Sequence, residues 1–460
     1  MTTTGTRAGR AGAAGGMFRA LAHRNFRLFL AGAFLSNAGT WMQTVAQSWL
    51  VLQLTDSGTW LGVDNLVATA PGLLLTLVGG VIADKVDRKR LLIYTQASAG
   101  LSALTLSLLV WAGAIRWEGA ARRPGDVWMV LVLTFVTGCC WAISSPSYQA
   151  ITVDLVERED VANAVALNSS QFQLARVVGP TLAALTLGAL GMAGCFLANG
   201  LSYAAIVLAL SRVRFERRGA GAAAAPVAAA AGGARAEGAA GGADAAAAEG
   251  EAARAAAAGA RSMRGDLAEG FRYVWGRPRV LAVLACSTAV SLFGIPYLVL
   301  MPLFARNVYA WGEAGLSLLM GTAGAGALVG ALTLAYLGDA RRKGLMLLGS
   351  MLSGGAGITA FSQAAAPWPA IPLLFGVGAS MVCFFALGNT LLQQLVRDEM
   401  RGRVMSMWIL TFVGTMPVGS FLSGAAADRF GPRPVLAACG LVVLLFGLAA
   451  ATLNPRLREM

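Results

Sequence analysis

Two charged side chains of this sequence lie where an ionised group could do chemistry inside an apolar environment. Arg176 is the only basic residue inside a long apolar run, and Asp64 is the only acid that lies away from the charged gaps between such runs. At the centre of a membrane helix a charge costs about 2.5–3.5 kcal/mol, so we expect Arg176 to face a partner or a hydrated cavity. It is then either a substrate or gating contact, or a structural link to the carbonyls of a neighbouring helix.

Asp64 has the chemistry of a proton carrier if it is buried. It lies about one turn inside one end of its helix. A carboxyl group held inside a protein can bind and release a proton as its surroundings change. Its place near the helix end favours the alternative, a hydrated aspartate at the outer mouth. Both interpretations stay open at this point.

Uncharged polar side chains recur at helical spacing in several apolar runs. One stripe contains Ser36, Thr40, Gln43 and Gln47, with Trp41 beside it. The other sets are Ser144, Tyr148 and Gln149; Ser169 and Gln173 on the face of Arg176; and Asn389 with Gln393. Such stripes suit a cavity for amphipathic organic molecules, although hydrogen bonds between helices explain any single member equally well. Gly179 and Pro180 follow Arg176 and predict a bend in that helix.

Several motifs and residue sets that enzymes commonly use are missing from the sequence. The chain has a single histidine, His23, which excludes a histidine-based catalytic set or a zinc site. It has no G-x-x-x-x-G-K-[ST] loop for a nucleotide. Its six cysteines all fall inside apolar runs and show no metal-ligand spacing. We therefore expect no enzyme activity, no metal and no cofactor.

The composition identifies the class of protein. Of the 460 residues 57% are hydrophobic and 13% are charged, whereas soluble domains carry about 25% charged residues. Such a chain is predicted to be an all-α integral membrane protein. The net charge of +13 does not indicate nucleic acid binding, because the basic residues lie in short gaps between apolar runs and not on a polar domain.

Twelve spans are predicted from runs long enough to cross a bilayer. The windows are 28–55, 65–83, 91–115, 127–153, 161–211, 280–305, 314–338, 344–396, 404–427 and 434–455. Two of them are long enough for two spans each: 161–211, with a turn near Gly188–Gly194, and 344–396, with a turn at Pro367. This places six spans in each half of the chain.

The basic residues predict the orientation. With both termini in the cytoplasm, all Lys and Arg lie inside except Arg176 and six outer arginines, which satisfies the positive-inside rule. The outer arginines are Arg116, Arg122, Arg123, Arg306, Arg429 and Arg433. The first apolar run is too long for a cleavable signal. The predicted location is the bacterial inner membrane.

Six segments follow from these patterns. Residues 1–27 and 456–460 are predicted as cytoplasmic tails, and 28–211 and 279–455 as two six-helix bundles. Residues 212–261 form a linker, in which 34 of the 42 residues at 219–260 are Ala or Gly. Residues 262–278 place Leu267, Phe271, Val274 and Trp275 on one helical face, which is typical of an amphipathic helix on the inner surface.

The two halves of the chain resemble each other. The gap GGVIADKVDRKR at 79–90 and the gap LGDARRKG at 337–344 each place an aspartate, Asp84 or Asp339, at the end of a span and basic residues soon after it. Internal duplication of a six-helix unit is typical of transporters, with the substrate path between the halves. Such a transporter would work on an ion gradient, since no nucleotide motif is present.

The first of these gaps resembles the loop 2–3 signature of the major facilitator superfamily, G-x-x-x-D-[RK]-x-G-[RK]-[RK]. Gly80, Asp84, Lys85, Arg88 and Lys89 match it, and the residue at the second glycine position is aspartate. That variation is common in the twelve-span branch of macrolide-efflux and enterobactin-exporter-like proteins. Four further segments are similar to that branch: RNFRLFLAG (24–32), NAVALNSSQFQLARVVGP (163–180), DLAEGFRYVWGRP (266–278) and ADRFGPRPVL (427–436).

The resemblance implies a gate at the inner ends of the spans. Asp84 would bind the N-terminus of a helix in the opposite half, where the helix dipole favours a carboxylate, and Arg88 would pair with Asp154. The alternative for the basic residues is ordinary positive-inside anchoring. The full set of predicted gating residues is Gly80, Asp84, Arg88, Lys89, Asp154, Asp339 and Arg342.

The function predicted from these observations is export of an amphipathic organic compound, such as a drug, siderophore or secondary metabolite. The two halves would alternately expose a central site, with coupling to protons or another ion. Facilitated diffusion or import of a small solute is one alternative, and a membrane sensor or scaffold that transports nothing is another. The expected partners are a small-molecule substrate, the coupling ion and the lipid bilayer, and the resemblance implies a monomer that binds no nucleic acid.

Overall fold

The computed structural model describes residues 18–117, 119, 122–213, 263–337, 342–454 and 458, and gives only the backbone of residues 74, 76–85, 263–268 and 413. Within these ranges the chain is helical and contains no β-strand. The predicted linker at 212–261 lies almost wholly outside the described residues, as do the first 17 residues of the predicted N-terminal tail.

The N-terminal half is a bundle of long helices. In order, its elements are η1 (Arg19–Ala22), α2 (Arg24–Thr55), α3 (Gly58–Lys85), α4 (Arg88–Trp111), η3 (Pro124–Asp126), α5 (Val127–Asp154), η4 (Arg158–Asp160) and α6 (Val161–Arg212). The helix α6 is two helices joined at Gly191, whose φ of 65° interrupts the helical backbone. The thiol of Cys195 reaches back to the carbonyl of Ala183, so the chain reverses within the predicted turn at 188–194.

The C-terminal half begins with α8 (Met263–Trp275) and ends with α16 (Pro432–Leu453). Between them lie α9 (Pro278–Ala289), η5 (Val290–Gly294), α10 (Pro296–Leu303), η6 (Phe304–Val308), α11 (Gly312–Leu337), α12 (Lys343–Gln363), α13 (Pro367–Leu395), α14 (Asp398–Val413) and α15 (Thr415–Phe430). The elements η5 and η6 are π-helical turns within one rod that runs from α9 to η6. Pro296 and Pro302 lack an amide hydrogen, which favours such irregular turns.

Nine helical segments of the described chain are long and apolar enough to cross a membrane. One of them contains the whole of α6, which has a reversal in its middle. Long helices also cover the first two predicted spans, where α2 has 32 residues and α3 has 28. The count of twelve crossings and the domain boundaries stay predictions.

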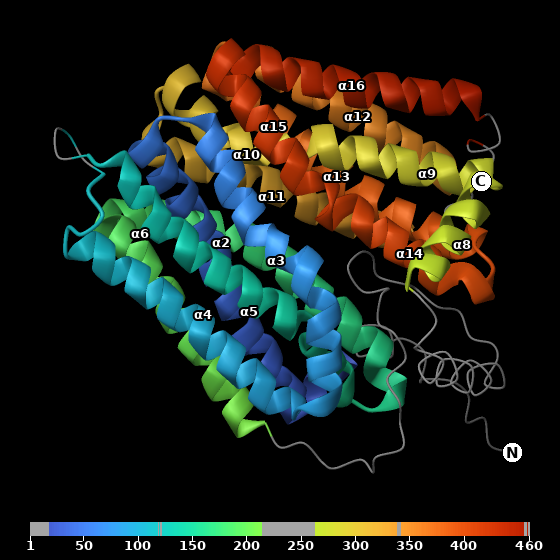
Figure 1. Cartoon of the computed structure of the whole chain (residues 1–460), viewed down its shortest axis with the longest axis horizontal. Coiled ribbons are helices and arrows are strands. Elements are labelled where there is room, and N and C mark those ends of the chain that lie inside the picture. The colour runs from blue at the N-terminus through green and yellow to red at the C-terminus, as the bar shows by residue number, and fades with distance from the viewer. Residues whose placement is uncertain are drawn as a thin grey trace, which may run out of the picture.

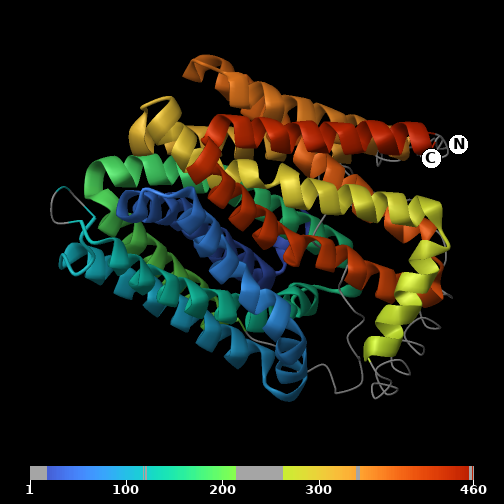
Figure 2. The same ribbon diagram turned by 45° about the horizontal axis from the view of Figure 1, so that its top comes forward.

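The helices form two bundles that repeat one packing pattern. In the first half α3 packs against α5, and α4 packs against both α5 and α6. In the second half α11 packs against α13 in the same way, and α12 packs against both α13 and α16. Figures 1 and 2 show the two bundles, blue to green and yellow to red, side by side along α3 and α15. The contact between the halves is completed by α6 and α11.

The surface of both bundles is apolar. Leu101, Leu185 and Leu441 are exposed although leucine usually lies in a protein core, and many other large apolar side chains share this exposure. An apolar belt of this extent requires a lipid surrounding. Fully buried aromatic rings such as Phe26, Phe29 and Phe361 fill the interior.

The helix α8 packs against the first turns of α14. Glu269 forms an ion pair with Arg403 at 2.8 Å, and the hydroxyl of Tyr273 accepts a hydrogen bond from the backbone N–H of Arg397. Of the predicted apolar face, Val274 is buried, whereas Phe271 and Trp275 are exposed. That these two rings enter the inner leaflet stays a prediction.

Candidate functional site

A cavity of about 500 Å³ lies in the N-terminal bundle and opens toward the C-terminal half. This volume is in the usual range for small-molecule sites. Its two walls differ in chemistry. The first bundle supplies hydroxyl, amide and carboxyl groups from several helices, whereas the described lining residues of the second are all apolar: Ile295, Leu298, Val299, Met320 and Met416.

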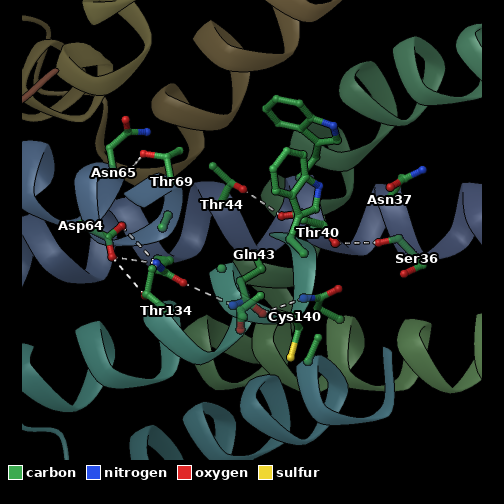
Figure 3. A pocket seen from close by; sticks show the side chains of 18 of the residues that line it. Ser36, Asn37, Thr40, Gln43, Thr44, Asp64, Asn65, Thr69, Thr134 and Cys140 are labelled. Atoms are coloured by element: carbon green, nitrogen blue, oxygen red, sulfur yellow. Dashed lines mark hydrogen bonds between the residues drawn. The ribbon is translucent and has the colours of Figure 1, made fainter. Parts of the chain in front are cut away.

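The predicted stripe on the first span forms much of the polar wall. Ser36, Thr40, Trp41, Gln43 and Gln47 all line the cavity from α2. They share one helical face, and Figure 3 shows labelled members of that face lying along α2 toward the cavity. From α5, the predicted residues Ser144 and Tyr148 also line the cavity.

Asp64 lies on the cavity wall and is bound by neutral groups. The side-chain amide of Gln47 donates to both of its carboxylate oxygens, at 2.9 and 3.0 Å, and the hydroxyl of Thr134 donates to one of them at 3.1 Å (Figure 3). Among the described side chains no Lys or Arg pairs with it. Within this part of the chain, neutral hydrogen-bond donors alone hold the carboxylate in place.

A chain of amide groups leads from this carboxylate across the bundle. Gln47 donates to Asp64 and accepts from Gln43 at 3.2 Å. Gln43 in turn accepts from the amide of Asn199 at 2.6 Å, and Asn199 accepts from Ser202. Every member donates toward Asp64, so the aligned dipoles favour negative charge at that end.

Many polar residues of the cavity wall are not singled out by the sequence pattern. Among them are Asn65, Thr134 and Asn199, and the last two belong to the hydrogen-bond network around Asp64. Single polar residues in an apolar run commonly bond to a neighbouring helix without lining a site. Their place in the cavity follows from the packing of α5 against α3 and of α6 against α2, which spacing along one helix does not specify.

Six other predicted residues lie away from the cavity. They are Gln149 on α5, Ser169, Gln173 and Arg176 on α6, and Asn389 and Gln393 on α13, none of which is part of its wall. The guanidinium of Arg176 lies 5.3 Å from the centre of the Trp41 ring, which itself lines the cavity. Such a cation–π contact fixes the indole and partly compensates the charge of the half-buried arginine. Arg176 therefore contacts the site through Trp41.

The predicted bend at Gly179 and Pro180 is not visible as a break in the helix. The one residue of α6 with non-helical backbone angles is Gly191. Gly179 instead allows a close approach of helices, since a Cβ there would lie 2.8 Å from the carbonyl oxygen of Ala38. Bending of the helix at this point during transport stays a prediction.

Two basic residues at the start of α4 make contacts within the N-terminal half. Arg88 pairs with Asp154 at 3.2 Å, and Lys89 donates to the carbonyls of Ser211 and Val213 at the end of α6. The pairing of Arg88 is the one that the family resemblance implies.

For the other predicted gating residues the described part of the chain gives no side-chain contact. The side chain of Asp84 lies outside the described set, and so does residue Asp339. Gly80 lies within α3, and Arg342 is exposed just before α12. The gating roles of the whole set stay predictions.

The pair formed by Arg88 and Asp154 is expected to contribute little to stability. Its side chains are 33% and 47% exposed, and exposed ion pairs are worth about 0.2–1 kcal/mol. A double-mutant cycle with Arg88→Ala and Asp154→Ala, read by thermal unfolding in detergent, should give a coupling energy within that range. A coupling above about 2 kcal/mol would contradict this and show that the pair is a main contact of the inner loops.

Almost the whole length of the chain matches one family model. The model is described as "Transmembrane secretion effector" and matches residues 15–234 and 245–460. The chain belongs to this family of the major facilitator superfamily. Its resemblance to the superfamily and its efflux-type branch, predicted from the loop signature, is thereby confirmed.

Curated relatives of the chain are transporters. The multidrug efflux pump Tap of Mycolicibacterium fortuitum is 26% identical over 448 residues, which cover 94% of this chain and 96% of that protein. Macrolide efflux protein A of Streptococcus pyogenes is 20% identical, covering 87% and 88%. The staphyloferrin A transporter of Staphylococcus aureus is 28% identical over 190 residues, a match that spans 41% of this chain and 46% of that protein.

Solved structures share the fold over nearly the whole chain. A bacterial homologue of the human lysosomal transporter Spinster, in an inward-facing and unoccupied conformation, has a TM-score of 0.65 at 13% identity and covers 95% of this chain and 97% of its own. A D-xylose–proton symporter has a TM-score of 0.69 at 11% identity, with coverages of 94% and 99%. At such identities the likeness shows the fold alone.

These comparisons confirm the predicted class. The chain is a helical, multi-pass membrane transporter with the major facilitator fold, and it is not an enzyme. The prediction of an efflux-type transporter for organic compounds is confirmed at the level of class. Binding of a small molecule follows from the family, whereas proton coupling, the monomeric state and the side on which the termini lie are proposals.

Proposed function

We propose that this protein exports neutral or cationic amphipathic organic molecules across the bacterial inner membrane in exchange for protons. The observation that carries the proposal is the cavity with a polar wall from one half, an apolar wall from the other, and Asp64 as the one carboxylate among its described lining residues. An amphipathic molecule would place its polar end against α2 and its apolar end against Ile295, Val299 and Met416.

The charge of the cavity favours a drug-like cation over an acidic siderophore. None of the described residues that line the cavity is Lys, Arg or His. The guanidinium of Arg176, beside the wall, lies over the Trp41 ring. An anionic ligand would therefore meet a carboxylate in a site of low dielectric, which is unfavourable.

Asp64 supports proton coupling through the same geometry. Its oxygens accept hydrogen bonds from Gln47 and Thr134, and it faces the cavity with no cationic partner among the described side chains. A carboxylate in this situation can be neutralised by a proton or by the positive centre of a substrate. If the carboxylate binds only one of the two at a time, a proton that binds from the outer side releases the substrate there. Protons then move inward while the substrate moves outward.

The topology is part of the proposal. Both termini lie in the cytoplasm, as the basic gaps indicate, and the protein works as a monomer. Impermeant labelling of single cysteines at positions 5 and 458 in intact cells should leave both unlabelled until the cells are opened. Labelling of either position in intact cells would contradict this topology.

Transport of a matched pair of dyes tests the substrate class. Rhodamine 123 and fluorescein share a xanthene core, but the first is a cation and the second an anion. In proteoliposomes with an acidic lumen we expect rhodamine 123 to accumulate at least about tenfold more than fluorescein. Addition of a protonophore should abolish the accumulation. Preferential transport of fluorescein would contradict the argument from the charge of the cavity. Accumulation of rhodamine 123 without a pH gradient would contradict exchange for protons.

A further inference from the structure

The outer ends of the two halves are joined by a carboxylate on a helix terminus. Asp428, near the end of α15, accepts hydrogen bonds from the hydroxyls of Ser57 and Thr59 and from the backbone N–H groups of Gly58 and Thr59. These groups form the first turn of α3, where unpaired N–H groups and the helix dipole favour an anion. The contact joins the second half to the first.

Glycines allow the two helices to touch at this point. A Cβ at Gly58 would lie 2.8 Å from the carbonyl oxygen of Gly424, and one at Gly62 would lie 2.7 Å from that of Ser420. A Cβ at Gly424 would collide with the carbonyl oxygen of Gly58. Any larger residue at position 424 must therefore push α15 away from α3.

A second link lies at the same end of the molecule. Arg306, in η6 of the second half, forms an ion pair with Asp56, which follows α2 in the first half. Arg306 also donates to the carbonyl of Leu52 at 3.2 Å. Figure 1 shows the two bundles meeting where α3 begins and diverging toward the ends of α8 and α14.

The segment that carries Asp428 repeats the spacing of the loop signature. Counted from Gly80, an aspartate lies four positions later (Asp84), a basic residue five positions later (Lys85) and another basic residue nine positions later (Lys89). From Gly424 the same steps reach Asp428, Arg429 and Arg433. This second copy lies at the opposite end of the molecule, on the helix that packs against α3.

The contacts made by the two copies correspond as well. Lys89 donates to carbonyls at the end of α6, and Arg433 donates to the carbonyl of Ala364 at the end of α12, at 3.2 Å. In each copy the last basic residue thus caps the C-terminus of another helix in its own half. The correspondence extends from sequence to geometry.

We propose that Asp428 is the outer counterpart of Asp84, and that its binding to the first turn of α3 holds the outer side closed. The helices α3 and α15 run antiparallel, since the start of α3 touches the end of α15, and each ends in a Gly-x-x-x-Asp sequence. Asp428 binds the start of α3 at the outer side. Asp84 would bind the start of α14, the helix that leads into α15, at the inner side and in the opposite phase of the cycle. The proposal rests on transport by alternating access.

Distances between spin labels test the proposal without any substrate. Gly125 and Ala366 are exposed in outer turns of opposite halves, while Glu157 and Leu345 are exposed on the inner side of opposite halves. Labels at these pairs are introduced as cysteines after replacement of the six native cysteines. Asp428→Asn should lengthen the outer distance and shorten the inner one. The ratio of molecules with the outer side open to molecules with the outer side closed should rise about tenfold.

Further variants separate a latch from a purely structural contact. Gly424→Ala should shift both distances in the same direction as Asp428→Asn, whereas Gly376→Ala, at a position with open space around it, should shift neither. Asp84→Asn should shift them in the opposite direction, and the Asp84→Asn/Asp428→Asn double variant should return toward the original ratio. Unchanged distances in both Asp428→Asn and Gly424→Ala would overturn the proposal. Because dye transport is not measured, failure of the proposed substrate class would leave this result untouched.

Discussion

Replacement of Asp64 by asparagine is expected to abolish proton-driven accumulation of rhodamine 123, with a loss of about 100-fold in initial rate. Asparagine has nearly the same shape but can neither release a proton nor balance a cation. The carboxylate now accepts three hydrogen bonds from Gln47 and Thr134, and a buried amide cannot replace it without leaving a donor unpaired. The measurement is dye uptake into proteoliposomes with an acidic lumen.

Two controls define what this loss means. Glu313→Gln makes the same chemical change at the start of α11, outside the cavity wall, and should keep its coupling to the pH gradient. Thermal unfolding of Asp64→Asn in detergent should show a folded protein, so that the loss is one of coupling and cation binding and not of folding. Full gradient-driven uptake by Asp64→Asn would exclude Asp64 as the proton carrier.

A second large effect is expected from Gly324→Val at the contact between α11 and α6. A Cβ at Gly324 would lie 2.7 Å from the carbonyl oxygen of Arg176. This obstacle is backbone, so it cannot rotate away, and overpacking of this kind costs about 1–3 kcal/mol. Because the two helices belong to different halves, the valine should wedge the halves apart and lower the transport rate at least about tenfold.

Gly349→Val provides the matched control for this variant. Gly349 lies on α12, and no atom lies close to the position of its Cβ. We expect it to transport at the original rate and to unfold at the original temperature. Equal activity of the two variants would show that α6 and α11 do not need to approach this closely at any stage of transport.

The fold can be predicted largely from hydropathy. Apolar runs place helices correctly even where the chain reverses, as at Gly191 and before Pro367. Helix ends are less accurate: α2 begins at Arg24, four residues before the predicted window, because a charged residue can continue a helix beyond the hydrocarbon. The π-helical turns are harder to predict, because Pro296 and Pro302 indicate an irregular helix but do not specify the kind of turn.

The site can be predicted only in part, for a physical reason. The stripe from Ser36 to Gln47 follows one helix face, so spacing along the chain is enough to find it. The pairing of Asn199 with Gln43 joins helices far apart in the sequence, and spacing cannot show it. The apolar wall at Leu298 looks, in a sequence, like any surface that faces lipid. Asp428 does carry a signal, the repeated Gly-x-x-x-Asp spacing, which hydropathy alone does not detect.

The unequal walls of the cavity have a consequence for how the range of transported compounds could change. Contacts with aliphatic side chains such as Val299 and Met416 have no preferred direction, so they tolerate ligands of different outline. The hydrogen-bonded wall around Asp64 imposes direction and sign of charge. Selection for export of a wider range of uncharged molecules should therefore collect substitutions in the second half. Selection for a changed preference for ligand charge should collect them in the first.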